Sequence, residues 1–138
     1  MIKEFNSLNE IKKYYDEKTN TYIFKEDGSY IDSIVFNFDL DVLVNIEACD
    51  IKANNIYANN IRAFNIKANN IDAMNIEACE INASDIRANN INAWNIYAKN
   101  ITYYAVCYAY NNIKCKSIKG RRANSKHFVL DGTLEVIE

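Results

Sequence analysis

Few residues in this chain of 138 could do covalent or metal chemistry. His127 is the only histidine, and Cys107 or Cys115 could join it as a thiol–imidazole pair or in a metal site. The four cysteines lack the close paired spacing of a zinc site or a secreted disulfide framework. Cys115 takes a small-residue position of the repeat described below, and His127 adjoins a predicted end of the fold. We therefore expect reduced thiols, no metal, no cofactor, no catalytic residue and no enzymatic activity.

Aromatic and basic side chains near the C-terminus are the stronger candidates for a binding site. A tyrosine-rich run over 103–110 precedes a basic stretch over 114–126, and such a combination suits phosphates, stacked bases or an acidic protein face. We also include Trp94 among the candidates, because we expect it on an outer wall and large exposed apolar groups are typical of interfaces. The predicted partner-binding residues are Trp94, Tyr103, Tyr104, Tyr108, Tyr110, Lys114, Lys116, Lys119, Arg121, Arg122 and Lys126. The alternative is that the tyrosines only pack between two coils.

A five-residue repeat must position these side chains. Isoleucine stands at every fifth position from Ile46 to Ile101, twelve times without a gap, and alanine follows two residues after the first eleven. Asn or Asp precedes eleven of the twelve isoleucines, so the unit is Asn-Ile-x-Ala-x. A period of five fits neither a helix nor a straight strand, so the chain must turn a corner in each unit. Ile and Ala then face a core, and the residue between them faces outward.

The repeat resembles that of the pentapeptide-repeat proteins over about residues 46–128. This resemblance implies an all-β, right-handed, quadrilateral β-helix, here of about four coils. The family's commonest unit has the small residue before the large one, whereas the order here is reversed, as in Ile46-Glu47-Ala48. Tyr103 takes an alanine position, and a two-residue insertion follows. The register resumes, as a degenerate fourth coil, at Ile113, Ile118, Ala123 and Phe128.

Two stacking patterns are open. Three sides align residues 15 apart and stack four outer residues, Cys49, Phe64, Cys79 and Trp94. Four sides align residues 20 apart and bring Lys52 over Asp72. Opposite charges on neighbouring rungs are favourable, so the sequence favours four sides, which also put Trp94 and Met74 in one column.

The flanking segments are predicted to cover the open ends of the β-helix. A capping box of Ser7 and Glu10 predicts a helix within residues 1–20, and an Asp-Gly turn predicts a hairpin over 21–35. Alternating apolar residues over 36–46 predict a strand that leads into the first pentad.

A second Asp-Gly turn predicts another hairpin over 127–137, which caps the other end or pairs with its twin in a homodimer. The predicted division is therefore an N-terminal cap at 1–44, a β-helix at 45–128 and a cap or dimerisation strand at 129–138.

The formal net charge of -2 excludes the strongly cationic field of a general nucleic-acid binder. No apolar stretch suits a signal peptide or a membrane span, and the composition resembles AT-rich coding sequence, so we expect a cytoplasmic protein of a bacterial host. We expect a non-enzymatic binding protein with a rigid surface, for example a phage or mobile-element inhibitor of a bacterial nucleic-acid enzyme or ribonucleoprotein, such as an anti-CRISPR. The alternatives are a nucleic-acid-binding module that uses residues 114–126, and a self-assembling structural protein.

Overall fold

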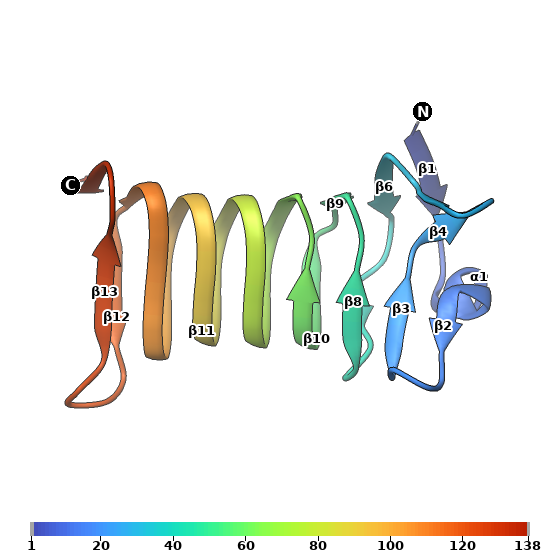
Figure 1. Ribbon diagram of the computed structural model, residues 1–138, viewed down its shortest axis with the longest axis horizontal. Helices are drawn as coiled ribbons and strands as arrows, with labels where there is room; N and C mark the ends of the chain where they lie inside the picture. The colour runs from blue at the N-terminus through green and yellow to red at the C-terminus, as the bar shows by residue number, and fades with distance from the viewer. Residues whose placement is uncertain (1, 138) are drawn as a thin grey trace.

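The computed structural model describes residues 2–137 and shows an all-β solenoid of about six turns. Its coils stack along the long axis, and the N- and C-terminal segments lie at opposite ends (Figure 1). In chain order the elements are β1 (Ile2–Phe5), α1 (Leu8–Ile11), the 3-10 turn η1 (Lys12–Tyr14), β2 (Tyr15–Asp16), β3 (Thr21–Ile23), β4 (Lys25–Glu26), β5 (Ser29–Tyr30), β6 (Ser33–Phe36), β7 (Leu40–Asp41), β8 (Asn45–Glu47), β9 (Asp50–Lys52), β10 (Asn55–Arg62), β11 (Asn65–Cys115), β12 (Ser117–Gly120), β13 (Lys126–Val129) and β14 (Thr133–Val136).

Each regular turn has three sides and 15 residues, so the preference for four sides is wrong. Parallel ladders pair Ile51 with Ile66, Ile56 with Ile71, and Ile61 with Ile76. The charge pairing that favoured four sides is a weak determinant, because an exposed ion pair contributes only about 0–1 kcal/mol. The buried Ile and Ala recur in every pentad and the corner hydrogen bonds in most of them, and together they outweigh it.

We name the three sides by their isoleucines. Wall A carries Ile46, Ile61, Ile76 and Ile91; wall B carries Ile51, Ile66, Ile81 and Ile96; wall C carries Ile56, Ile71, Ile86 and Ile101. All twelve are at most 3% exposed, and the alanines from Ala48 to Ala93 are also buried. The predicted assignment of Ile and Ala to the inside is therefore confirmed.

Asparagine ladders hold the corners. On wall A, Asn60 Nδ2 donates to Asn45 Oδ1 at 2.7 Å, Asn75 donates to Asn60 at 2.7 Å, and Asn90 donates to Asn75 at 2.9 Å. A side-chain amide both donates and accepts, so the ladder continues from coil to coil, whereas a carboxylate can only accept. This explains why asparagine dominates the position before each isoleucine.

The solenoid begins before the repeat. β3 pairs with β8, β6 with β9 and β7 with β10, all in parallel, so residues 21–41 form coils of the same stack. The hairpin predicted over 21–35 is therefore wrong in its pairing: β4 and β5 form a short antiparallel hairpin, whereas β3 pairs antiparallel with β2. Asp27 and Gly28 make its turn with positive φ values of 53° and 80°. The strand predicted over 36–46 is interrupted by corners, one of which holds Leu43 at φ 52°.

β1, α1, η1 and β2 close the N-terminal end. The predicted helix is reduced to four residues, and Ser7 makes no side-chain cap. Glu10 instead accepts a bond of 2.7 Å from the backbone N–H of Asn6. An aromatic cluster packs under these elements, with ring centroids 5.2–6.2 Å apart among Phe5, Tyr14, Phe24 and Phe36.

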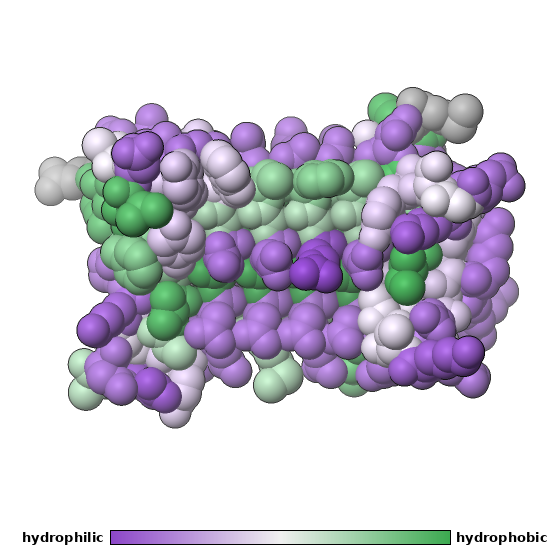
Figure 2. Space-filling model, viewed as in Figure 1, coloured by the Kyte–Doolittle hydropathy of each residue, from purple (hydrophilic) through white to green (hydrophobic). Residues whose placement is uncertain are grey.

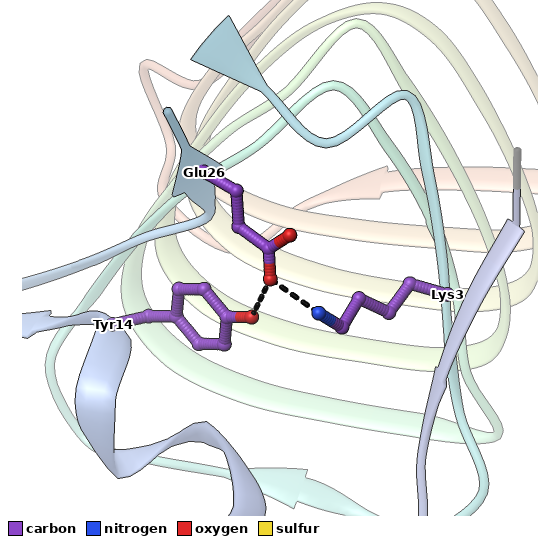
Figure 3. Close-up of polar contacts among 3 residues, drawn as sticks. All are labelled: Lys3, Tyr14 and Glu26. Carbon is purple, nitrogen blue, oxygen red and sulfur yellow. Dashed lines mark hydrogen bonds and ion pairs between the residues drawn. The ribbon is translucent and has the colours of Figure 1, made fainter. Parts of the chain in front are cut away.

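A polar tie joins this cap to the β4–β5 hairpin. The carboxylate of Glu26 accepts hydrogen bonds from the Tyr14 hydroxyl and the Lys3 ammonium (Figure 3). The bond with Glu26 raises the pKa of Lys3, and the same bond lowers the pKa of Glu26. Three elements far apart in the first 26 residues are thereby fixed to one another.

The C-terminal coil is irregular. The number of residues between paired positions on neighbouring coils rises from 15 to 17 for Ile101 and Ile118, which confirms the two-residue insertion after Tyr103. It rises to 21 for Ile113 and Leu134. The predicted positions of Ile113 and Ile118 are confirmed, but Ala123 lies in an exposed loop and Phe128 faces outward.

The hairpin predicted over 127–137 is wrong, since β13 and β14 each pair in parallel with β11 and form two sides of the last coil. Within the described residues, β12, β13 and β14 pair with no strand except β11.

Candidate interaction surfaces

Outward side chains form rows along the solenoid, because in the regular coils each residue stacks on the one 15 positions earlier. Figure 2 shows these rows as parallel hydrophilic and hydrophobic stripes. The outward wall rows are Glu47, Arg62, Glu77 and Asn92 on wall A; Lys52, Lys67, Asn82 and Tyr97 on wall B; and Tyr57, Asp72, Arg87 and Thr102 on wall C. The corners that follow them carry Cys49, Phe64, Cys79 and Trp94 (corner A); Asn54, Asn69, Ser84 and Lys99 (corner B); and Asn59, Met74, Asn89 and Tyr104 (corner C).

Corner A is the one apolar row among the three. We call Cys49, Phe64, Cys79, Trp94 and Tyr110 the apolar edge. Phe64 is 57% exposed and Trp94 is 52% exposed, and the Trp94 ring lies 4.7 Å from that of Tyr110. Backbone bonds of 2.8 Å run from Phe64 to Cys49 and from Cys79 to Phe64. This is the column of the three-sided alternative, and the predicted grouping of Trp94 with Met74 is wrong.

A groove of about 310 Å³ follows wall A beside the apolar edge, and Phe64 and Trp94 are among its lining residues. Arg62 Nε lies 3.8 Å from Glu77 Oε2 in this groove, and both side chains are more than half exposed. Such a pair is weak, so a partner can replace it at little cost.

Tyr103 is not available to a partner, which corrects its predicted role. The side chain is 1% exposed and occupies an alanine position of wall C. Its hydroxyl lies 2.6 Å from His127 Nδ1. Gly120 is its partner on the next coil, and an added Cβ there would lie 3.0 Å from the Tyr103 hydroxyl. For Tyr103, the alternative of packing between coils is therefore confirmed.

The other predicted aromatic residues lie at different places around the solenoid. Tyr108 packs on Phe128 with ring centroids 4.9 Å apart, on wall A. Tyr104 is on corner C, where the Arg122 guanidinium lies 5.0 Å from its ring centroid. Of the predicted aromatic residues, only Tyr110 and Trp94 share a row.

The basic stretch winds around all three walls and forms no single patch. Lys114 lies on wall B and Lys116 above corner B, whereas Lys119 pairs in register on wall C. Arg121 follows corner C, and Lys126 begins the wall A strand of the last coil. Wall B instead joins Lys114 to Lys52 and Lys67 of the repeat, and the adjoining corner B joins Lys116 to Lys99. Sequence reasoning missed this set, and counting in steps of 15 finds only Lys52 and Lys67, because the insertion places Lys114 over Tyr97 and Lys116 over Lys99.

Cys107 and Cys115 show no sign of activation. Cys107 pairs in register with His127, but Nδ1 of His127 faces Tyr103. Burial raises the pKa of the Cys107 thiol to about 12, whereas a thiol nucleophile needs a lowered pKa. Burial also raises the pKa of Cys115. Residues 2–137 hold no cluster of three or more His, Cys, Asp or Glu side chains that could bind a metal ion.

Within the same part of the chain, no helix has the length and apolar character needed to cross a membrane. Comparisons with protein-family models, curated proteins and solved structures found no match to this chain. What the chain binds is therefore inferred from its own surfaces.

Proposed function

We propose that this chain is a non-enzymatic binding module whose apolar edge docks on a protein partner. The supporting observation is that Phe64 and Trp94, each more than half exposed, stand in one line on one corner. Aligned large apolar side chains on a surface are typical of interaction sites, and tryptophan is enriched among the residues that dominate binding energy.

The rigidity of the scaffold supports the same proposal. Parallel ladders and asparagine bonds fix the spacing of the coils, so the apolar edge orders little when a partner binds. An aromatic side chain also loses few rotamers, because it has only two χ angles. The charged groove on wall A borders the apolar edge and supplies the polar rim that protein interfaces have.

Comparative capture with matched variants tests the proposal. The chain, the double variant Phe64→Ser/Trp94→Ser and the control Met74→Ser/Tyr104→Ser are immobilised in a bacterial lysate, and captured proteins are quantified by mass spectrometry. We expect a partner held by the parent chain and by the control to fall at least about tenfold with the apolar-edge variant, since buried aromatic anchors contribute about 2 kcal/mol or more each.

The control likewise replaces two large exposed side chains with serine, but on corner C. There Met74 is 51% exposed and Tyr104 is 43% exposed. Circular dichroism must show that both variants keep the β spectrum. Equal capture by all three proteins would contradict the proposal, because the apolar edge would then contribute nothing.

The narrower prediction, inhibition of a bacterial nucleic-acid enzyme such as a CRISPR effector, is part of this proposal. An excess of the purified chain should suppress target cleavage by the effector, and Phe64→Ser/Trp94→Ser should restore cleavage. Full cleavage in the presence of the parent chain would reject that effector as the partner.

A further inference from the structure

We infer that wall B is a second, independent binding site, and that its ligand is a single strand of nucleic acid. The site consists of Lys52, Lys67, Tyr97 and Lys114 on wall B, with Lys99 and Lys116 on the adjoining corner B. It lies on a different wall from the groove beside the apolar edge, and the two proposals can fail separately.

Charge is the first reason. A groove of about 460 Å³ runs along wall B, and the described residues that line it include Lys52, Lys67, Lys99 and Lys114 but no carboxylate. Among residues 2–137, none of these lysines has a carboxylate within ion-pair distance. The wall A groove instead alternates in sign, with Arg62 between Glu47 and Glu77. Glu135 follows Lys114 in register on the last coil, so the positive charge is concentrated on the coils before it. Ammonium groups without an ion-pair partner favour a polyanion, because each phosphate they neutralise releases counterions.

Spacing is the second reason. Lys52 and Lys67 stand on consecutive rungs, and Lys116 stands directly above Lys99 with a backbone bond of 2.8 Å. Neighbouring rungs of a β ladder are about 4.8 Å apart, so the site is a straight track about 19 Å long from Lys52 to Lys114. A track of this kind follows the backbone of several nucleotides.

The centre of the track favours a single strand over a duplex. Tyr97 is half-buried in the outward row, between Asn82 one rung before it and Lys114 one rung after it. An aromatic ring beside a basic groove stacks on an unpaired base, and each such stack contributes about 1–3 kcal/mol. The bases of a duplex are already stacked on one another, so Tyr97 would contribute little to duplex binding.

Fluorescence anisotropy with labelled 12-mers of thymidine and of uridine tests the inference, with a 12-base-pair duplex for comparison. At about 50 mM salt we expect saturable binding to at least one single strand and weaker binding to the duplex. Lys67→Gln/Lys114→Gln should weaken binding at least about tenfold and reduce the salt slope by about 1.4, because a single strand contributes about 0.7 per phosphate contact. Tyr97→Leu should weaken binding to the single strand and leave duplex binding unchanged.

The matched control is Lys119→Gln/Lys126→Gln, which removes the same charge from walls C and A. We expect it to change the affinity less than about threefold, as only non-specific attraction is lost. Asn82→Lys adds a cation at the centre of the track and should tighten binding.

Absence of binding at low salt, equal losses from the two double variants, or tighter binding of the duplex with no effect of Tyr97→Leu would each overturn the inference. A loss of binding by Phe64→Ser/Trp94→Ser that equals the wall B loss would also overturn it, because the strand would then lie elsewhere.

Discussion

Cys107 shows how burial changes the chemistry of one side chain. It takes the isoleucine position of wall A near the end of the repeat and is fully buried. Loss of solvation disfavours its thiolate, and the nearby Cys115 thiol raises its pKa further. The thiol is therefore a core group in this fold, although its type suggests reactivity.

The raised pKa of Cys107 predicts a loss of stability in alkali. Below pH 9.0 the thiol is protonated in both states, but above this value the unfolded chain releases a proton that the fold retains up to a pKa of about 12. The free energy of unfolding should therefore fall by about 1.4 kcal/mol per pH unit from this group. Urea unfolding at pH 8.5, 9.5 and 10.5 checks this against Cys107→Val, which should lose less stability. Parallel curves for the two proteins would contradict the assignment.

Gly120 lies where the neighbouring side chains leave no room for a Cβ atom. A Cβ at this position would lie 2.3 Å from the Cβ of Ser125, too close for any real contact. Gly120→Ala should lower the free energy of unfolding by about 1–3 kcal/mol, as in other overpacked sites. The loss should be smaller in a Ser125→Gly background, because the nearest clash is then removed. Chemical unfolding of the four proteins gives this cycle, and identical losses in the two backgrounds would mean that Ser125 is not the obstacle.

At the scale of elements, each pentad combines a buried pair with an exposed residue. Ile71 and Asp72 are adjacent on wall C, but Ile71 is 1% exposed and Asp72 faces water. A strand directs neighbouring side chains to opposite faces, so the two positions should tolerate change very differently.

Ile71→Asp is expected to prevent folding. The new carboxylate would be buried without a partner, at a cost above about 4 kcal/mol, which rivals the total stability of a small domain. Asp72→Asn is the matched control, and it should change the free energy of unfolding by less than about 0.5 kcal/mol. Far-ultraviolet circular dichroism and urea unfolding give both answers. A folded Ile71→Asp protein would contradict the inward orientation of this isoleucine.

At the scale of the whole molecule, the two ends differ. The N-terminal end has the aromatic cluster and the tie of Lys3, Tyr14 and Glu26. In the C-terminal coil, β12, β13 and β14 pair with β11 and with no other described strand, and Val136 is 53% exposed. Repeat proteins gain stability from nearest-neighbour contacts, so a coil with one neighbour is weaker than a coil with two.

The rate of backbone amide hydrogen exchange should therefore differ from coil to coil along the solenoid. Amides of residues 117–136 should exchange fastest, and those of the coil that contains Ile71 should exchange slowest. The N-terminal cap should be intermediate, because side-chain packing partly replaces the missing coil. Exchange followed by mass spectrometry checks this order. Protection of residues 117–136 equal to that of the middle coil would show that the C-terminal end is covered in solution.

The sequence by itself determined which side chains are inside. Burial of Ile and Ala and the corner role of Asn are local properties of each pentad, so an uninterrupted run of twelve units was enough to predict a β-solenoid core. The first coils were missed because Tyr22, Ile34 and Leu40 lie in segments of unequal length without the pentad pattern.

Only the tertiary structure decided what lies on the outside. The number of sides depends on contacts between residues 15 apart, and no single pentad encodes it. That number places Trp94 next to Tyr110, and Lys52 and Lys67 on the same wall as Lys114, while the basic stretch after 114 is divided among three walls. The hydrophobic period sets the distance of each residue from the axis, whereas its neighbours on the surface follow from how the whole chain closes into a coil.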